Sequence, residues 1–309
     1  MKSGMDLISI HDLSVGDVEE ILALAADLKA RQKAGIPHPL LAGKTLGMIF
    51  EKSSTRTRVS FEVGMYQLGG RALFLSSRDL QLGRGEPIAD TARVLSRYLD
   101  GIMIRTYGHE RIEELARWAD VPVINALSDL LHPCQALTDL LTIREHKGRL
   151  AGLKMAYVGD GNNMTHSLMY AAAKVGMHFA AATPAGYEPN ENVVQNARAD
   201  AAETGASVTL THDPKEAVRD ADVVVTDTWA SMGQEAEHDA RTAVFRPYQV
   251  NRALLAAADR RAVVMHCLPA YRGEEITADV FESFADVIFD EAENRLHVQK
   301  AIMALVMGG

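Results

Sequence analysis

The sequence lacks the features of a secreted, metal-scaffolded or membrane protein. It has two cysteines, Cys134 and Cys267, which lie far apart and form no Cys-x-x-Cys pair. This usage argues against a disulfide framework or a zinc site and is typical of a reducing compartment. No stretch approaches the roughly 20 apolar residues that span a bilayer, and residues 1–6 lack the apolar core of a signal peptide. We therefore expect a cytoplasmic protein with no membrane partner and no metal.

Positive charge is also scarce. Lysine and arginine number 32 against 41 acidic residues, which gives a formal net charge of −9. No basic tract interrupts this balance, so a nucleic-acid partner is not expected. The 309 residues suffice for two domains, and 47 % apolar with 24 % charged residues is typical of a globular chain. Any site for an anion must then be a local pocket within a negative protein.

Short apolar runs alternate with helical patterns along the whole chain. This alternation predicts an α/β fold with two open parallel-sheet domains, the second Rossmann-like, joined by interdomain helices. The expected helices include 14–34, the bridge 135–148 and 294–307, and the polar stretch 229–246 is expected to be a functional loop. The expected strands are 45–50, 71–75, 101–104 and 121–125 in the first half, then 154–158, 178–182, 207–211, 222–226, 262–266 and 287–289 in the second.

The segment Ser54-Thr55-Arg56-Thr57-Arg58 stands where a predicted strand ends and a helix begins. Free backbone N–H groups and the positive end of the helix dipole suit an oxyanion at such a point. Simple helix capping explains one hydroxyl residue, but five consecutive hydroxyl and guanidinium residues exceed that need. No Gly-Lys-Ser/Thr follows a glycine-rich turn, so the pattern favours a small phosphorylated substrate over a nucleoside triphosphate.

Other strand ends in the first half carry further donors. Arg105 follows one strand, and His132 with Gln135 precedes the bridging helix; Gln81 is a weaker candidate. Taken singly, an exposed arginine or a structural histidine is the commoner case. Together they predict that the first half holds an anionic donor such as a phosphate ester.

The second half offers amide, carboxylate and thiol groups instead. Asn163 follows one strand, Asp227 a second and Cys267 a third. The Gly159-x-Gly161 turn invites a dinucleotide interpretation, but the third glycine position is Met164 and no acid ends the next strand. The contrast between the halves predicts an anionic donor in one domain and an amine or amino acid in the other.

Four motifs in order resemble the ornithine carbamoyltransferases over essentially the whole chain. They are Ser54-Thr55-Arg56-Thr57-Arg58, His132-Pro133-x-Gln135, Asp227-x-x-x-Ser231-Met232-Gly233 and His266-Cys267-Leu268-Pro269. The first two resemble carbamoyltransferases in general, and the last two resemble the ornithine enzymes.

The resemblance implies transfer of a carbamoyl group from carbamoyl phosphate to L-ornithine, with no cofactor. It implies a carbamoyl-phosphate domain over 1–134, to which the C-terminal helix 294–309 returns, an ornithine domain over 135–293, and a homotrimer in which Gln81 reaches a neighbouring subunit's ligand. The ornithine site would comprise Asn163, Asp227, Ser231 and Met232, and the catalytic groups would be Cys267, Arg56, Arg105 and His132. The carbamoyl-phosphate site would comprise Ser54, Thr55, Arg56, Thr57, Arg58, Gln81, Arg105, His132, Gln135, Cys267, Leu268 and Arg295.

Three alternatives stay open from the sequence. The acceptor could be aspartate, putrescine or an acylated ornithine, although the acid and amide groups near Asp227 favour a cationic acceptor. An NAD-dependent oxidoreductase is the second alternative, and a non-catalytic binding protein with a decayed site is the third.

Overall fold

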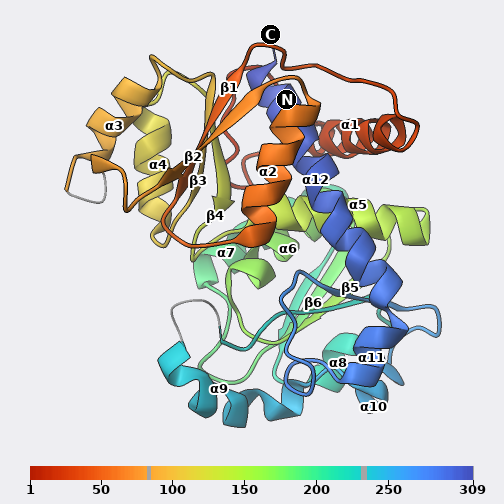
Figure 1. Cartoon of the computed structure of the whole chain (residues 1–309). Helices are drawn as coiled ribbons and strands as arrows, with labels where there is room; N and C mark the ends of the chain where they lie inside the picture. Colours follow the sequence, from red (N-terminus) through yellow and green to blue (C-terminus); the bar gives the residue numbers. More distant parts are fainter. Residues whose placement is uncertain (82–84, 231–234, 309) are drawn as a thin grey trace. The chain divides into compact units, whose positions relative to one another are not determined.

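The computed structural model of the chain describes residues 1–81, 85–230 and 235–308 (Figure 1). It divides into two compact units, one of residues 1–141 with 294–309 and one of residues 142–293. The dividing point at residue 141 lies inside a helix, α5 (Pro133–Lys147), that starts beside the expected junction at 134 and 135. Within the described residues, no helix is long and apolar enough to cross a membrane.

The first unit is built on a four-stranded parallel sheet with the order β2-β1-β3-β4. Its chain runs outward from β1 to β2, then returns to the other side of β1 for β3 and β4, so the winding direction reverses between β1 and β3. In such sheets ligands bind beyond the carboxyl ends of the strands at the reversal. The elements before α5 are α1 (Val15–Lys33), β1 (Thr45–Phe50), α2 (Thr55–Gln67), β2 (Arg71–Ser76), α3 (Ile88–Leu95), β3 (Gly101–Arg105), α4 (His109–Trp118) and β4 (Val123–Leu127).

The last helix, α12 (Ala285–Met307), supplies residues from Asn294 onward to this unit. It packs beside α2, as Figure 1 shows for the orange and blue helices. Gly64 permits the approach, because a Cβ there would lie 3.0 Å from Met303 Cε and 3.2 Å from Lys300 Cγ. The end of the chain therefore lies against the helix that follows β1.

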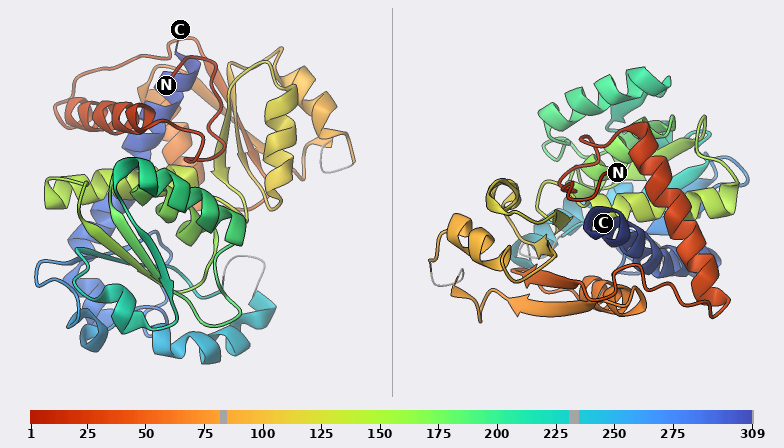
Figure 2. Two further views of the ribbon diagram at one scale, coloured as in Figure 1. Left: turned by 180° about the vertical axis from the view of Figure 1, so that it is seen from behind. Right: turned by 90° about the horizontal axis from the view of Figure 1, so that it is seen from above.

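The second unit contains a five-stranded parallel sheet with the order β7-β6-β5-β8-β9 (Figure 2). The chain runs from β5 outward to β7 and then returns to β8 and β9, so the reversal lies between β5 and β8. This doubly wound order confirms the predicted Rossmann-like sheet. The elements are β5 (Lys154–Val158), α6 (Asn163–Lys174), β6 (His178–Ala182), α7 (Glu191–Thr204), β7 (Val208–Thr211), α8 (Pro214–Val218), β8 (Val223–Thr226), α9 (His238–Phe245), α10 (Arg252–Leu255), β9 (Val263–His266) and α11 (Ala278–Ser283).

Two local predictions from the sequence are wrong. The expected strand 287–289 lies inside α12, because a three-residue apolar run cannot by itself distinguish a strand from a buried helix. The stretch 229–246 is not a plain loop, since it contains α9 and a short 3-10 helix, Glu235–Glu237. Phe245 of α9 is fully buried and packs edge-on to Tyr187 at 4.8 Å between ring centres.

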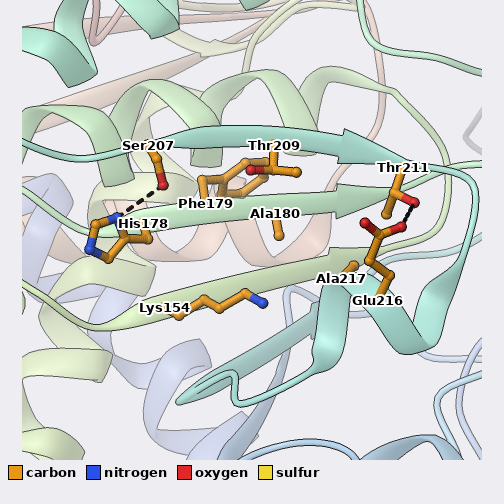
Figure 3. Close-up of a pocket in the computed structure, with 9 residues that line it drawn as sticks. All are labelled: Lys154, His178, Phe179, Ala180, Ser207, Thr209, Thr211, Glu216 and Ala217. Atoms are coloured by element: carbon orange, nitrogen blue, oxygen red, sulfur yellow. Dashed lines mark hydrogen bonds between the residues drawn. The ribbon is translucent and has the colours of Figure 1, made fainter.

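A groove of about 340 Å³ lies on one face of the second sheet (Figure 3). Its lining comes from the amino-terminal halves of β5 and β6, from β7 and from α8, and includes none of the residues that follow β5 or β8. Its polar groups already have partners: Lys154 Nζ donates to Arg219 O at 2.7 Å, and His178 Nδ1 lies 3.0 Å from Ser207 Oγ. This groove therefore does not match the predicted anion or amino-acid sites.

Lys300 is fully buried between α12 and α2 without a carboxylate among its hydrogen-bond partners. Its Nζ donates to Gln67 Oε1 at 2.9 Å and lies 3.1 Å from His38 Nε2. Burial lowers the pKa of Lys300 from 10.5 to about 8. Below pH 8 the folded protein therefore carries a poorly solvated ammonium, which costs roughly 3 kcal/mol at 1.36 kcal/mol per pKa unit.

We expect Lys300→Met to raise the free energy of unfolding at pH 7 by roughly 1–3 kcal/mol, since it removes that buried charge. Between pH 8 and 10.5 the unfolded wild type keeps a proton that the folded form has lost, so wild-type stability should rise relative to the variant and the gap should close. Urea titrations at several pH values measure this, with exposed Lys2→Met as the control. A stability difference between wild type and Lys300→Met that does not change with pH would contradict the lowered pKa of Lys300.

Candidate active site

The hydroxyl-arginine segment begins α2 at the carboxyl end of β1, next to the reversal of the first sheet. Ser54 is the N-cap of α2, and its hydroxyl accepts a hydrogen bond from Thr57 N at 3.2 Å. Other N–H groups of the first turn have no carbonyl partner within the helix. The structure therefore places a helix N-terminus, a position that suits an anion, where the sequence predicts one.

Three residues that are remote in the sequence meet beneath this helix end. Arg295 of α12 donates from Nη2 to Thr57 Oγ1 at 2.7 Å and from Nη1 to Gln135 Oε1. Gln135 in turn donates from Nε2 to Asp139 Oδ1 at 2.8 Å. Thr57, Gln135 and Arg295 are all buried, so this network fixes α2, α5 and α12 against one another within the first unit.

Arg105 and His132 are also buried, at the ends of β3 and just before α5. The pKa of His132 lies well below its usual value of 6.5, first because burial disfavours the cation and then because Arg295 and Arg105 repel it. The imidazole is consequently neutral at physiological pH. A neutral imidazole can donate one hydrogen bond to a carbonyl oxygen while two guanidinium groups supply positive charge.

The remaining predicted residues of the first unit are less enclosed. Arg56 is partly buried and Thr55 is exposed at the start of α2. Arg58 turns to the outer face, where its guanidinium lies 3.8 Å from the centre of the Phe74 ring and 3.6 Å from Glu62. Gln81 is exposed, and no hydrogen bond within the described residues joins its side chain to Arg105.

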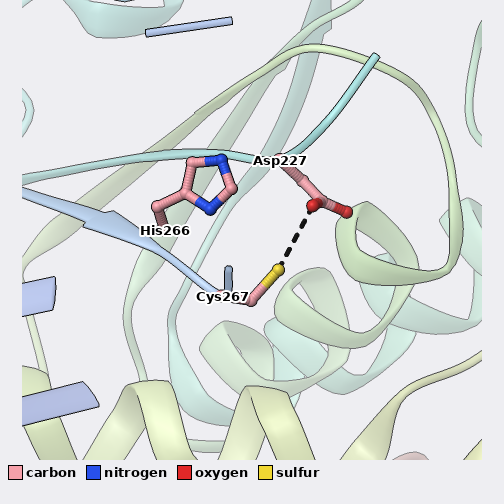
Figure 4. Close-up of side chains that lie close together, drawn as sticks. All are labelled: Asp227, His266 and Cys267. Carbon is pink, nitrogen blue, oxygen red and sulfur yellow. Dashed lines mark hydrogen bonds between the residues drawn. The ribbon is translucent and has the colours of Figure 1, made fainter. Parts of the chain in front are cut away.

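The second cluster lies at the reversal of the second sheet, where β5 and β8 end. Asp227 follows β8, and its Oδ1 accepts from Cys267 Sγ at 3.2 Å and from Thr228 N at 2.8 Å. Asn162 caps α6 and donates from Nδ2 to Asp227 Oδ2 at 3.3 Å. Figure 4 shows the thiol of Cys267 directed at the Asp227 carboxylate. Carboxylate, amide and thiol thus meet as predicted, next to Asn163 at the first position of α6.

A buried acid and a histidine hold the backbone after Cys267. Leu268 has a positive φ of 61°, which is unusual for a branched side chain, and its N–H donates to His266 Nδ1 at 2.9 Å. The other ring nitrogen, Nε2, therefore carries the proton and donates to Glu275 Oε1 at 3.0 Å. This pair fixes Cys267 and Leu268, which lie in the second unit and not in the Arg105 cluster. No sequence motif indicated Glu275, because a single acid after a proline turn is usually exposed.

Asp160 and Arg241 form a further ion pair that the sequence did not predict. Arg241 of α9 is buried and donates from Nη2 to Asp160 Oδ2 and from Nε to Trp229 O. Burial raises the pKa of Asp160 to about 6, although Arg241 opposes the shift; the charge of Asp227 adds to it. The pair anchors α9 beside the Asp227 cluster. Ser231 and Met232, the other predicted ornithine ligands, lie outside the described residues.

Asp227, His266 and Cys267 also have the donor types of a metal site. One ligand atom from each lies within 4.8 Å of the others. Both ring nitrogens of His266 are already hydrogen-bonded, to Leu268 N and to Glu275, so a metal would have to displace one of these bonds. The geometry is better described as a hydrogen-bond network than as a ligand set.

The dinucleotide alternative is disfavoured by the packing of Gly161. A Cβ at this glycine would lie 2.4 Å from Glu188 C and from Pro189 N, and Gly161 N donates to Tyr187 O at 2.9 Å. The protein's own backbone therefore occupies the close approach that a pyrophosphate needs in a Rossmann turn.

We expect the pKa of His132 to lie well below 6.5, because burial disfavours the cation and protonation would place a third positive charge beside Arg295 and Arg105. Nitrogen-15 NMR of histidine-labelled protein measures this, with His132→Gln to assign the signal. A titration midpoint near 6.5 would contradict the proposed burial and charge environment.

Comparison with known proteins shows the family of the chain. Residues 5–145 match the aspartate/ornithine carbamoyltransferase carbamoyl-P binding domain, and residues 151–306 match the Asp/Orn binding domain of the same family. Ornithine carbamoyltransferase of Carboxydothermus hydrogenoformans is 62 % identical over 305 residues, covering 99 % of this chain and 98 % of the relative. The solved ornithine carbamoyltransferase structure from Pyrococcus furiosus superposes with a TM-score of 0.96 at 59 % identity, covering 99 % of this chain and 98 % of that one. The solved anabolic enzyme from Campylobacter jejuni gives 0.91 at 44 % identity, with 97 % of each chain covered. The chain belongs to the aspartate/ornithine carbamoyltransferase family.

Proposed function

We propose that the protein transfers the carbamoyl group of carbamoyl phosphate to the side-chain amine of L-ornithine, giving L-citrulline and phosphate. The observation that carries this proposal is the contrast between the two sheet reversals. The first collects arginines, hydroxyls and a neutral imidazole, while the second collects a carboxylate, amides and a thiol. The relatives at about 60 % identity are named for the same reaction.

The first unit binds and activates the donor in this mechanism. The N–H groups and hydroxyls of Ser54, Thr55 and Thr57 bind the phosphate, as do the guanidinium groups of Arg56 and Arg58. Arg105 also donates to the phosphate. Together with neutral His132 it donates to the carbamoyl oxygen, on which negative charge develops as the tetrahedral intermediate forms. Arg295 holds this set in place, since its guanidinium donates to both Thr57 and Gln135.

The second unit binds and deprotonates the acceptor. Asp227 binds the α-ammonium group of ornithine, and Asn163 with Ser231 and Met232 binds the rest of the amino acid. The side-chain amine has an ordinary pKa of about 10.4, so it arrives protonated and must lose a proton before it attacks. Cys267 is hydrogen-bonded to Asp227 and is the group that assists this loss. Leu268 contacts the carbamoyl group through its backbone.

Ornithine fits better than the alternative acceptors. Aspartate would need an additional cation for its second carboxylate, and the nearby Arg241 is already bound to Asp160. Putrescine has no carboxylate and would leave the amide groups near Asn163 without a ligand. The acid at Asp227 instead matches an ammonium group.

We also propose that the protein is a homotrimer in the cytoplasm, with Gln81 completing a neighbour's site. Support comes from exposed apolar side chains on α2 and on the edge strand β2. Tyr66 is 81 % exposed and Val59 is 53 % exposed, and both lie on one face of α2 with Val63. Leu73 and Phe74 of β2 are 48 % and 40 % exposed. A cluster of this kind is typical of a surface that another subunit covers.

The direct test is a colorimetric citrulline assay with ornithine, putrescine and aspartate offered in parallel. We expect product with ornithine, and we expect Arg105→Ala to lower turnover by a factor on the order of 10²–10³, because one fixed donor to the oxyanion is lost. Arg252→Ala on the surface of the second unit is the matched control and should retain activity. Equal rates with putrescine, or an active Arg105→Ala enzyme, would refute these assignments.

The oligomer is tested by multi-angle light scattering of wild type and Tyr66→Glu. We expect a mass near three times 33.7 kDa for the wild type and a shift toward the monomer for the variant, because a carboxylate would be desolvated in the interface. Exposed Tyr271→Glu in the second unit serves as control. A monomeric wild type, or an unchanged Tyr66→Glu mass, would contradict the proposed surface.

A further inference from the structure

The residue that follows β1 is an acid, although the proposed substrate is a dianion that binds at this strand end. Glu51 is 13 % exposed and stands three residues before the N-cap Ser54. An unpaired carboxylate here would repel a phosphate group, since like charges a few ångströms apart interact strongly near a protein surface. The partners of Glu51 therefore determine its effect on the site.

Glu51 binds the end of β3 through both its backbone and its side chain. Glu51 N donates to Arg105 O at 2.9 Å, and Glu51 Oε2 accepts from the hydroxyl of Thr106. Its two carboxylate oxygens also accept a fork from Arg111 of α4, with Nη2 at 2.6 Å and Nε at 3.2 Å. The Arg111 guanidinium thus neutralises the negative charge of Glu51, and Thr106 is fully buried.

The segment that Glu51 binds is irregular. The register between β3 and β4 shifts between Ile104 and Arg105, so the regular ladder does not continue to the point where the Arg105 side chain leaves the sheet. Irregularities of this kind commonly re-aim a side chain. Beyond the shift, Thr106 N donates to Leu127 O at 3.0 Å, and Glu51 supplies the bonds on the other side.

We propose that Glu51, with Thr106 and Arg111, is a positioning residue that holds Arg105 in place for phosphate and carbonyl binding before the ligand arrives. This inference rests on the proposed function, because Arg105 is assigned there to carbamoyl phosphate. Glu51 touches no substrate. It lowers the cost of binding by fixing a donor that would otherwise have to be ordered when the ligand binds.

The protein provides a matched control at the other end of β1. Asp100 accepts from Thr45 N at 2.8 Å and pairs with Lys44 at 3.2 Å, so it also combines one strand hydrogen bond with one cation. Asp100→Asn should reduce stability about as much as Glu51→Gln, because both remove a partly exposed ion pair. Because Asp100 lies beside the amino end of β1, the Asp100→Asn variant should bind phosphate as the wild type does.

The experiment compares wild type, Glu51→Gln, Thr106→Val, Thr106→Ser and Asp100→Asn. Calorimetry gives the Kd of inorganic phosphate, and citrulline formation gives KM for both substrates. We expect Glu51→Gln and Thr106→Val to raise the phosphate Kd and the KM for carbamoyl phosphate about tenfold relative to Asp100→Asn. The KM for ornithine should change less than twofold, and Thr106→Ser, which keeps the hydroxyl, should behave like the wild type.

The inference is overturned if the phosphate Kd of Glu51→Gln and Thr106→Val lies within twofold of that of Asp100→Asn. It is also overturned if the KM values for both substrates rise by the same factor. If Glu51→Gln does not fold, the pair Thr106→Val and Thr106→Ser decides the question. A wild type that binds phosphate but makes no citrulline would refute the proposed function alone, and the phosphate comparison would still test Glu51. A wild type that makes citrulline, with variants that bind phosphate normally, would refute the inference alone.

Discussion

The reversal of winding direction in each sheet is the constraint on which the rest of this structure depends. At a reversal, the connections after two neighbouring strands leave toward opposite sides, so the strand ends between them remain uncovered. In the first unit the ends of β1 and β3 expose the start of α2 and Arg105. In the second unit the ends of β5 and β8 bring Asn162 to Asp227. In both sheets, therefore, the candidate site residues lie at the point where the winding direction reverses.

Charge at the first reversal is balanced by a small number of buried bonds. Arg295 and Gln135 secure the underside of α2, while Glu51 and Arg111 secure the end of β3. Burial, together with the two guanidinium groups near His132, keeps its imidazole neutral, so one environment provides both fixed positive charge and an uncharged donor. Fixed donors of this kind need little reorganisation when negative charge develops on a reacting oxygen.

Much of the fold could be predicted from the sequence, because strand patterns are local. Three strands, including 154–158, have the expected bounds, and the alternation with helices gave the correct sheet class. The strand expected at 287–289 failed because its apolar residues belong to a long helix, and their pattern is ambiguous over three positions. The stretch 229–246 was expected to be a loop because its charges conceal that Arg241 is buried.

The site residues that could be predicted from the sequence are likewise those that a local pattern marks, and the ones that were missed act through distant contacts. Ser54, Arg105 and Asp227 were accessible to sequence reasoning, since each lies at or near the end of a recognisable strand. Arg295 was reached only through the resemblance of the whole chain, and Glu275 and Arg111 were missed. Their roles arise from contacts between segments that no pattern within a short window connects, such as Arg295 with Thr57. The family relationship and the structure together supply that distant information.

The place of Arg295 in the chain has a consequence for synthesis on the ribosome. Domains generally begin to fold from the amino terminus while translation continues. Residues 142–293 form a contiguous unit, whereas the first unit needs residues from Asn294 onward. The guanidinium that binds Thr57 and Gln135 emerges only after almost the entire polypeptide has been made. A nascent chain therefore lacks this part of its anion pocket until translation is nearly complete, and metabolite binding cannot assist the earlier stages of its folding through that contact.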